Sequence, residues 1–80
     1  MRVVSETPMV EFKLTIYSWN NKYLLKYERG MYEQTYKVSE FDVSGDKDIM
    51  TIANDPDFVK EVLDKFKNMN SHLNEALNRI

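Results

Sequence analysis

The residues of this 80-residue chain that could perform acid–base chemistry lack the spacing of a catalytic set. His72 is the only histidine, and no serine, cysteine or carboxylate stands near it at the spacing of a catalytic set. The better interpretation of His72 is a solvent-exposed histidine on the surface of a helix. Glu28 and Glu33 would face each other across a hairpin, but an open sheet face lacks the cleft that a catalytic carboxylate pair needs. We therefore predict no enzymatic activity.

A group of aspartates in the middle of the chain raises the question of a metal site. The group consists of Asp42, Asp46, Asp48, Asp55 and Asp57. A calcium loop needs alternating oxygen ligands, a glycine at the sharp bend and a closing bidentate glutamate. Gly45 here precedes four of the five aspartates, and no glutamate follows at the required distance. Carboxylates that complement helix dipoles explain the group, so we predict neither metal nor cofactor.

The composition is that of one small domain. Hydrophobic residues make up 42% and charged residues 30%, which is ordinary for a globular chain, and the net charge of −2 argues against a whole-surface polyanion binder. The absence of cysteine excludes disulfides and zinc–thiolate sites. No segment has the apolar length of a signal peptide core or a membrane span. We expect a single domain over residues 1–80, in the cytoplasm, that gains stability by forming a homodimer.

Residues 10–29 predict a β-hairpin that turns at Asn20-Asn21. Apolar and polar residues alternate with a period of two, and the two asparagines can adopt the positive φ angles of a type I′ turn. This turn sets Trp19 opposite Lys22, Tyr17 opposite Leu24, Ile16 opposite Leu25, Leu14 opposite Tyr27 and Lys13 opposite Glu28. Apolar residues then meet apolar ones, and opposite charges meet. A second turn at Gly30-Met31 adds a third antiparallel strand.

The number of strands stays open between three and four. Residues 1–8 are short, mixed and end in proline, so we expect a flexible arm, with an edge strand over residues 2–5 as the alternative. Phe41 and Val43 have the spacing of a strand, and they predict an extension of the third strand or a short fourth one. Gly45 then ends it.

A long C-terminal helix begins at a strong start signal. Asp55 at the N-cap, Pro56 at the first position and Asp57 in the first turn all favour a helix start. Apolar residues then recur at spacings of three and four: Val59, Val62, Phe66, Met69, Leu73, Ala76 and Ile80. A helix over residues 56–79 is longer than the strands, so we expect its last two turns to overhang the sheet. The predicted fold is α+β, a two-layer meander with this helix on one face.

Asn70 is a polar residue within the apolar arc of the predicted helix. A single polar residue in a helix–helix seam can specify register and oligomeric state. The alternative is that Asn70 lies on the overhang and contacts water.

The outer face of the sheet carries the most information about function. The predicted register gathers there an interaction patch of Tyr17, Trp19, Lys22, Leu24, Lys26 and Lys37, with Thr15 and Thr35 beside it. An apolar patch with a polar rim is typical of a protein interface, in which Trp and Tyr are enriched. Aromatic side chains among lysines also suit single-stranded nucleic acid, whose bases stack on the rings.

We therefore expect a small non-catalytic domain that self-associates or binds another protein, with single-stranded nucleic acid as the alternative ligand and no role at a membrane. In its order of strands followed by a helix, with aromatic side chains on the strands, the predicted topology is similar to that of the PUR and Whirly single-strand binders. None of their sequence motifs is present, and a predicted sheet of three strands has one strand fewer than theirs.

Overall fold

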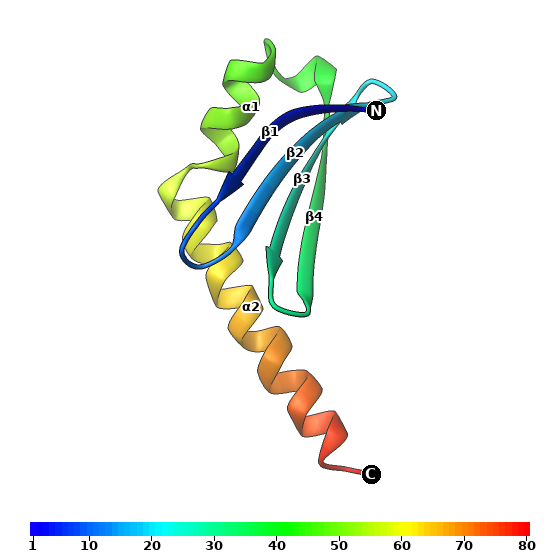
Figure 1. The fold of residues 1–80 in the computed structure, drawn as a ribbon, viewed down its shortest axis with the longest axis vertical. Coiled ribbons are helices and arrows are strands. Elements are labelled where there is room, and N and C mark those ends of the chain that lie inside the picture. The colour runs from blue at the N-terminus through cyan, green and yellow to red at the C-terminus, as the bar shows by residue number, and fades with distance from the viewer.

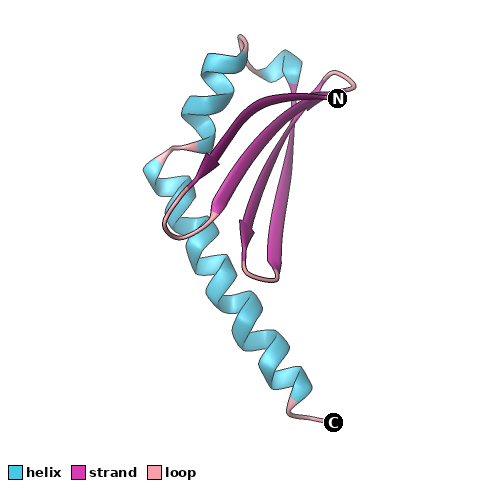
Figure 2. Cartoon of the chain, in the orientation of Figure 1, coloured by secondary structure: helices cyan, strands magenta, loops and turns pink.

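The computed structural model describes all 80 residues as four strands followed by helices (Figure 1). The elements are β1 (Arg2–Pro8), β2 (Lys13–Trp19), β3 (Lys22–Arg29), β4 (Tyr32–Ser39), the 3-10 turn η1 (Glu40–Asp42), α1 (Asp46–Ala53) and α2 (Pro56–Leu77). The strands form one antiparallel sheet in the order β1-β2-β3-β4. Both helices pack on the same face of this sheet (Figure 2). The predicted α+β meander with a C-terminal helix is confirmed, with four strands.

The register of the central hairpin is the one that the sequence predicts. Asn20 and Asn21 have φ angles of 52° and 62°, as a type I′ turn requires. All five predicted cross-strand pairs of β2 and β3 are present, among them Tyr17 opposite Leu24. The turn at Gly30, with φ of 60°, sets Glu28 opposite Glu33 between β3 and β4.

The prediction of a flexible N-terminal arm is wrong, because β1 pairs along the edge of the sheet with β2. Arg2 donates two hydrogen bonds to the carboxylate of Asp46, of 3.1 and 3.2 Å, and the Tyr23 hydroxyl donates a third of 2.7 Å. The hydrogen bond from Arg2, and next the one from Tyr23, lower the pKa of Asp46. The first residue of α1 thereby connects the start of β1 to the middle of the sheet.

Two other strand boundaries differ from expectation. The predicted start of the hairpin at Val10 is wrong: the Met9 amide donates to the Phe12 carbonyl at 2.8 Å, which closes a turn between β1 and β2. The predicted strand extension through Phe41 is also wrong. The hydroxyl of Ser39 accepts a hydrogen bond from the Phe41 amide at 3.3 Å and caps η1, which takes the chain off the sheet.

The core lies between the inner face of the sheet and the two helices. Its buried apolar members are Phe12, Leu14, Ile16, Tyr23, Leu25, Tyr27, Ile49, Ala53, Val62 and Phe66. Tyr27 is fully buried, and its hydroxyl donates a 2.7 Å hydrogen bond to the Ala53 carbonyl. Because this bond gives the hydroxyl group a partner, Tyr27 can occupy the centre of the core without leaving a buried polar group unpaired.

The helix α2 starts as the sequence predicts and extends beyond the sheet. Asp55 is the N-cap, and its carboxylate accepts a 3.0 Å hydrogen bond from the Phe58 amide. The last hydrogen bond along α2 that reaches the sheet joins the Tyr32 hydroxyl to Asn70 at 3.0 Å. Residues 70–80, which we call the tail, are all exposed, and they give the molecule its length of 47 Å against 25 and 20 Å across (Figure 1).

Candidate interaction surfaces

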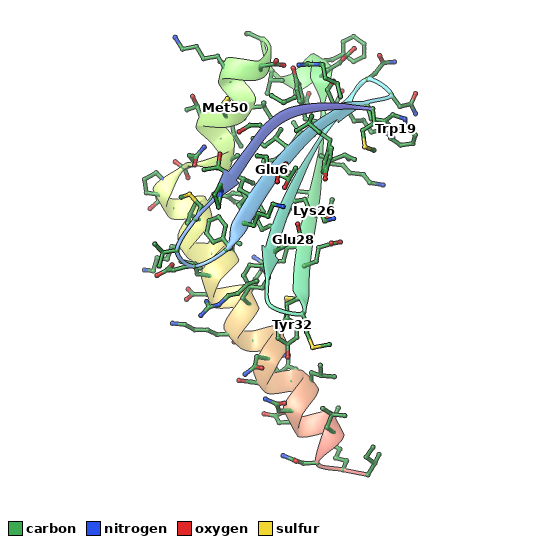
Figure 3. The ribbon with its side chains drawn as sticks, in the orientation of Figure 1. Glu6, Trp19, Lys26, Glu28, Tyr32 and Met50 are labelled. Carbon is green, nitrogen blue, oxygen red and sulfur yellow. The ribbon has the colours of Figure 1, made fainter.

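The outer face of the sheet bears the predicted interaction patch, and no other element covers it. Trp19 stands at the end of the sheet beside the β2–β3 turn (Figure 3), with 49% of its surface exposed. Tyr17 and Leu24 lie opposite each other in the next row and are half-buried. Lys22 is opposite Trp19, and Lys37 is opposite Leu24. The structure therefore brings the predicted patch residues together on one face.

The patch extends further than the sequence suggests. Val3 on β1 lies opposite Tyr17 and is 54% exposed, so it continues the row of apolar side chains to the sheet edge. Met1 joins Tyr17 and Leu24 around a shallow cavity of about 290 Å³. Neither residue was predicted to belong to the patch, because the N-terminal segment was expected to be a flexible arm.

The lysines of the outer face differ in whether a carboxylate neutralises them. Lys13 lies 2.9 Å from Glu6, and Lys26 lies 3.3 Å from Glu33. These hydrogen bonds are the first cause of the raised pKa values of both lysines. Lys22 and Lys37 form no ion pair. The outer face therefore has a free positive charge only at the end where Trp19 lies.

The tail of α2 is a second uncovered apolar surface. Phe66, under the sheet, is 2% exposed, whereas Leu73 and Leu77 are 48% and 53% exposed and Ile80 is fully exposed. All four side chains belong to one stripe, because the spacing of three and four residues continues without a break. The sheet ends at the β3–β4 turn, so nothing in the chain covers the second half of the stripe.

Asn70 marks the point where α2 leaves the sheet. It is exposed at the edge of the stripe, and its side-chain oxygen accepts the hydrogen bond from Tyr32. Tyr32 lies between the β3–β4 turn and the helix (Figure 3). The predicted part of Asn70 in a seam between helices stays a prediction, since it concerns a contact between two chains.

A half-open cavity of about 490 Å³ lies at this exit point. We call it the root cavity. Its lining includes Met31, Tyr32, Phe66 and Asn70, together with two cations, Arg29 and Lys67. Met31, at the tip of the turn, is almost fully exposed. The root cavity and the stripe of the tail are continuous, since Phe66 belongs to both.

The structure does not bring the histidine, the glutamate pair and the aspartates together in one site. His72 is exposed on α2. Glu28 and Glu33 face each other on the open outer face, where Lys26 pairs with Glu33. Asp46 is engaged by Arg2 and Tyr23. No three acidic or histidine side chains converge anywhere on the chain.

Comparison of the chain with protein-family models, curated proteins and solved structures finds no match. Neither helix combines the length and the apolar character that crossing a bilayer requires. The function must therefore be inferred from the geometry of the two uncovered surfaces.

Proposed function

We propose that this chain is a small non-catalytic interaction module whose first partner is a second copy of itself. The observation that carries the proposal is the unbroken apolar stripe of α2, which runs from Val62 in the core to Ile80 in solvent. Monomeric proteins rarely leave a regular apolar stripe in water, and such a surface indicates an interaction site. The cytoplasm remains the location that we propose for it.

The outer patch provides the module with a second surface, for another protein. Its centre of Trp19, Tyr17 and Leu24 matches the aromatic enrichment of interface cores. The ion pairs of Lys13 and Lys26 support this use, because a neutralised rim lowers the cost of removing water from the patch.

One observation favours a different ligand for the same patch. Lys22 lies opposite the half-exposed Trp19, Lys37 lies opposite Leu24 in the next row, and neither lysine has a carboxylate partner. A single-stranded oligonucleotide could stack a base on the indole while these lysines contact phosphates. Single-stranded nucleic acid is thus the second candidate ligand.

Sedimentation of the purified chain over a range of concentrations tests the proposal. We expect the mass to rise from that of the 9.5 kDa chain toward twice that value. A monomer at every concentration would contradict self-association.

Trp19 is the only tryptophan, so its emission in the same samples reports on the patch alone. Emission like that of indole in water at all concentrations would leave the patch free in the dimer, whereas a blue shift on concentration would place it in the contact. Quenching by single-stranded oligonucleotide that salt reverses would favour the nucleic-acid ligand, and Lys22→Glu with Lys37→Glu should then abolish it.

A further inference from the structure

Beyond the hydrogen bond of Asn70 to Tyr32, no hydrogen bond or ion pair joins the tail of α2 to the sheet. Residues 70–77 are helical, yet every one of them is exposed. Most helical stability in proteins comes from packing an amphipathic face, and isolated helices of this length are marginal in water. Cover for Leu73, Leu77 and Ile80 would therefore stabilise both the stripe and the helix itself.

The spacing of the tail is self-complementary with the root cavity. Leu73 lies seven residues after Phe66 and seven residues before Ile80. A two-fold axis beside Leu73 therefore brings Ile80 of one copy to Phe66 of the other, and the reverse. Such an isologous contact uses the same surface twice and closes at two copies. Met31, which projects from the β3–β4 turn into solvent, then meets the partner's apolar tail.

We propose that two copies pair antiparallel through their tails, with the axis beside Leu73 and Ile80 of each copy at the partner's root cavity. The inference rests on the proposed function, since it specifies the surface through which two copies associate. In this arrangement the second half of the stripe is covered as the first half is, but by the partner's helix and β3–β4 turn instead of by the sheet.

Charge does not oppose this contact. Glu75 and Arg79 lie 4.0 Å apart and pair within their own helix. By helical spacing, both point away from the stripe formed by Leu73 and Leu77. The tail therefore brings no unpaired charge into the contact, and the two cations at the root cavity, Arg29 and Lys67, are exposed. Burial of an unpaired charge would otherwise cost more than the apolar contact contributes.

The available area indicates a weak dimer. Ile80 and Met31 are fully exposed, and each offers roughly 60–120 Å² of apolar surface, from a transfer free energy at about 25 cal/mol per Å². Leu73 and Leu77 are half exposed, and each offers about half of that area. With apolar atoms forming about 60% of an interface, each copy would contribute roughly 300–600 Å². A total of about 600–1,200 Å² lies in the range of weak complexes. The dimer should accordingly dissociate on dilution.

Sedimentation of the full chain carrying Leu73→Glu and Leu77→Glu tests the contact. We expect this variant to stay monomeric at concentrations where the parent is a dimer, because the charges lie in the seam. The matched control, Asn68→Glu with Ser71→Glu, adds the same charge on the opposite side of α2 and should dimerise as the parent does. An unchanged Trp19 emission would show that each variant retains the folded sheet.

A cross-link tests the position of the axis. The chain has no cysteine, so Leu73→Cys places one thiol beside the proposed axis. Two such thiols can form a disulfide, which requires Cα atoms about 4.4–6.8 Å apart. We expect oxidation to produce a covalent dimer in Leu73→Cys, at a rate several-fold above that of Ser71→Cys.

The outcomes separate the two claims. A parent that remains monomeric would overturn both the inference and the proposed self-association. A parent dimer that persists in the Leu73→Glu, Leu77→Glu variant, or that dissociates in Trp19→Ser, would overturn only the tail contact and would assign self-association to another surface. Equal cross-linking of Leu73→Cys and Ser71→Cys would overturn the antiparallel arrangement.

Discussion

The two halves of α2 have the same apolar spacing and opposite surroundings. Val62 and Phe66 lie in the core, against the inner face of the sheet, whereas Leu73 and Leu77 extend the same stripe into solvent. The sheet covers the helix only as far as the β3–β4 turn, and the Tyr32–Asn70 hydrogen bond marks the boundary. An amphipathic pattern thus specifies that a face is to be covered, but not which element covers it.

The largest expected difference between the halves is in core packing. Phe66→Ala removes a ring that is fully enclosed, so we expect the free energy of unfolding to fall by about 3–5 kcal/mol. Leu77→Ala, in dilute monomer, should change the free energy of unfolding by less than about 1 kcal/mol, because that side chain is half exposed. Urea unfolding of both variants measures the contrast. Equal losses would show that the tail is packed within the monomer.

Tyr27 tests how α1 holds the covered side together. Tyr27→Phe removes the donor to the Ala53 carbonyl and leaves that buried acceptor unpaired, so we expect a loss of about 1–3 kcal/mol in the free energy of unfolding.

The same residue predicts a pH dependence. Burial raises the pKa of Tyr27 to about 12. Above its unfolded pKa of about 10, the unfolded chain releases the phenol proton while the folded chain retains it, so stability should fall as the pH rises from about 10 toward 12. Below pH about 10 the contribution is fully present. Denaturant titrations at several alkaline pH values should show a shallower fall in Tyr27→Phe, and parallel curves would contradict the assignment.

The start of α2 should matter less than its packed face. Asp55→Ala removes the acceptor for the Phe58 amide, and we expect a loss of about 0.5–2 kcal/mol. Thermal melts compare the stability of the parent with that of Asp55→Ala. Asp57→Ala is the control, because it removes a nearby carboxylate but leaves the cap in place. Coincident melts of Asp55→Ala and the parent would place the effective start of the helix elsewhere.

The smallest effect on monomer stability is expected at the boundary itself. Asn70→Leu removes an exposed hydrogen bond, so the free energy of unfolding in dilute solution should stay within about 0.5 kcal/mol of the parent. It widens the apolar stripe, however, and removes a polar group that can specify pairing. We expect tighter but less uniform association in sedimentation, and one unchanged species would show that Asn70 has no part in pairing between copies.

The sequence predicted the hairpin register residue by residue because two local rules agreed there. Asn20-Asn21 allowed one turn type, and only one register matched apolar to apolar residues across it. The same register predicted the gathering of Trp19, Tyr17 and Leu24 on the outer face. Fold and patch could be predicted together because both depend on alternation within one hairpin.

The sequence predicted the N-terminal edge strand only as the alternative to a flexible arm, for a physical reason. A register shift between Val3 and Ser5 interrupts the period of two, so the alternation that marks a strand is absent. Its anchor, the pairing of Arg2 with Asp46, joins residues far apart in sequence, and no local pattern predicts it. The contribution of Val3 to the patch therefore could not be predicted from the sequence.

Amide hydrogen exchange along α2 at low and high protein concentration tests most directly whether a second copy covers the tail. Amides of the covered half, around Val62 and Phe66, should be protected at both concentrations, since they open only with the core. Amides of residues 74–77 should exchange rapidly in dilute solution, where the uncovered helix frays, and slow down several-fold at high concentration. Exchange of residues 74–77 at the same rate at both concentrations would contradict cover by a second copy.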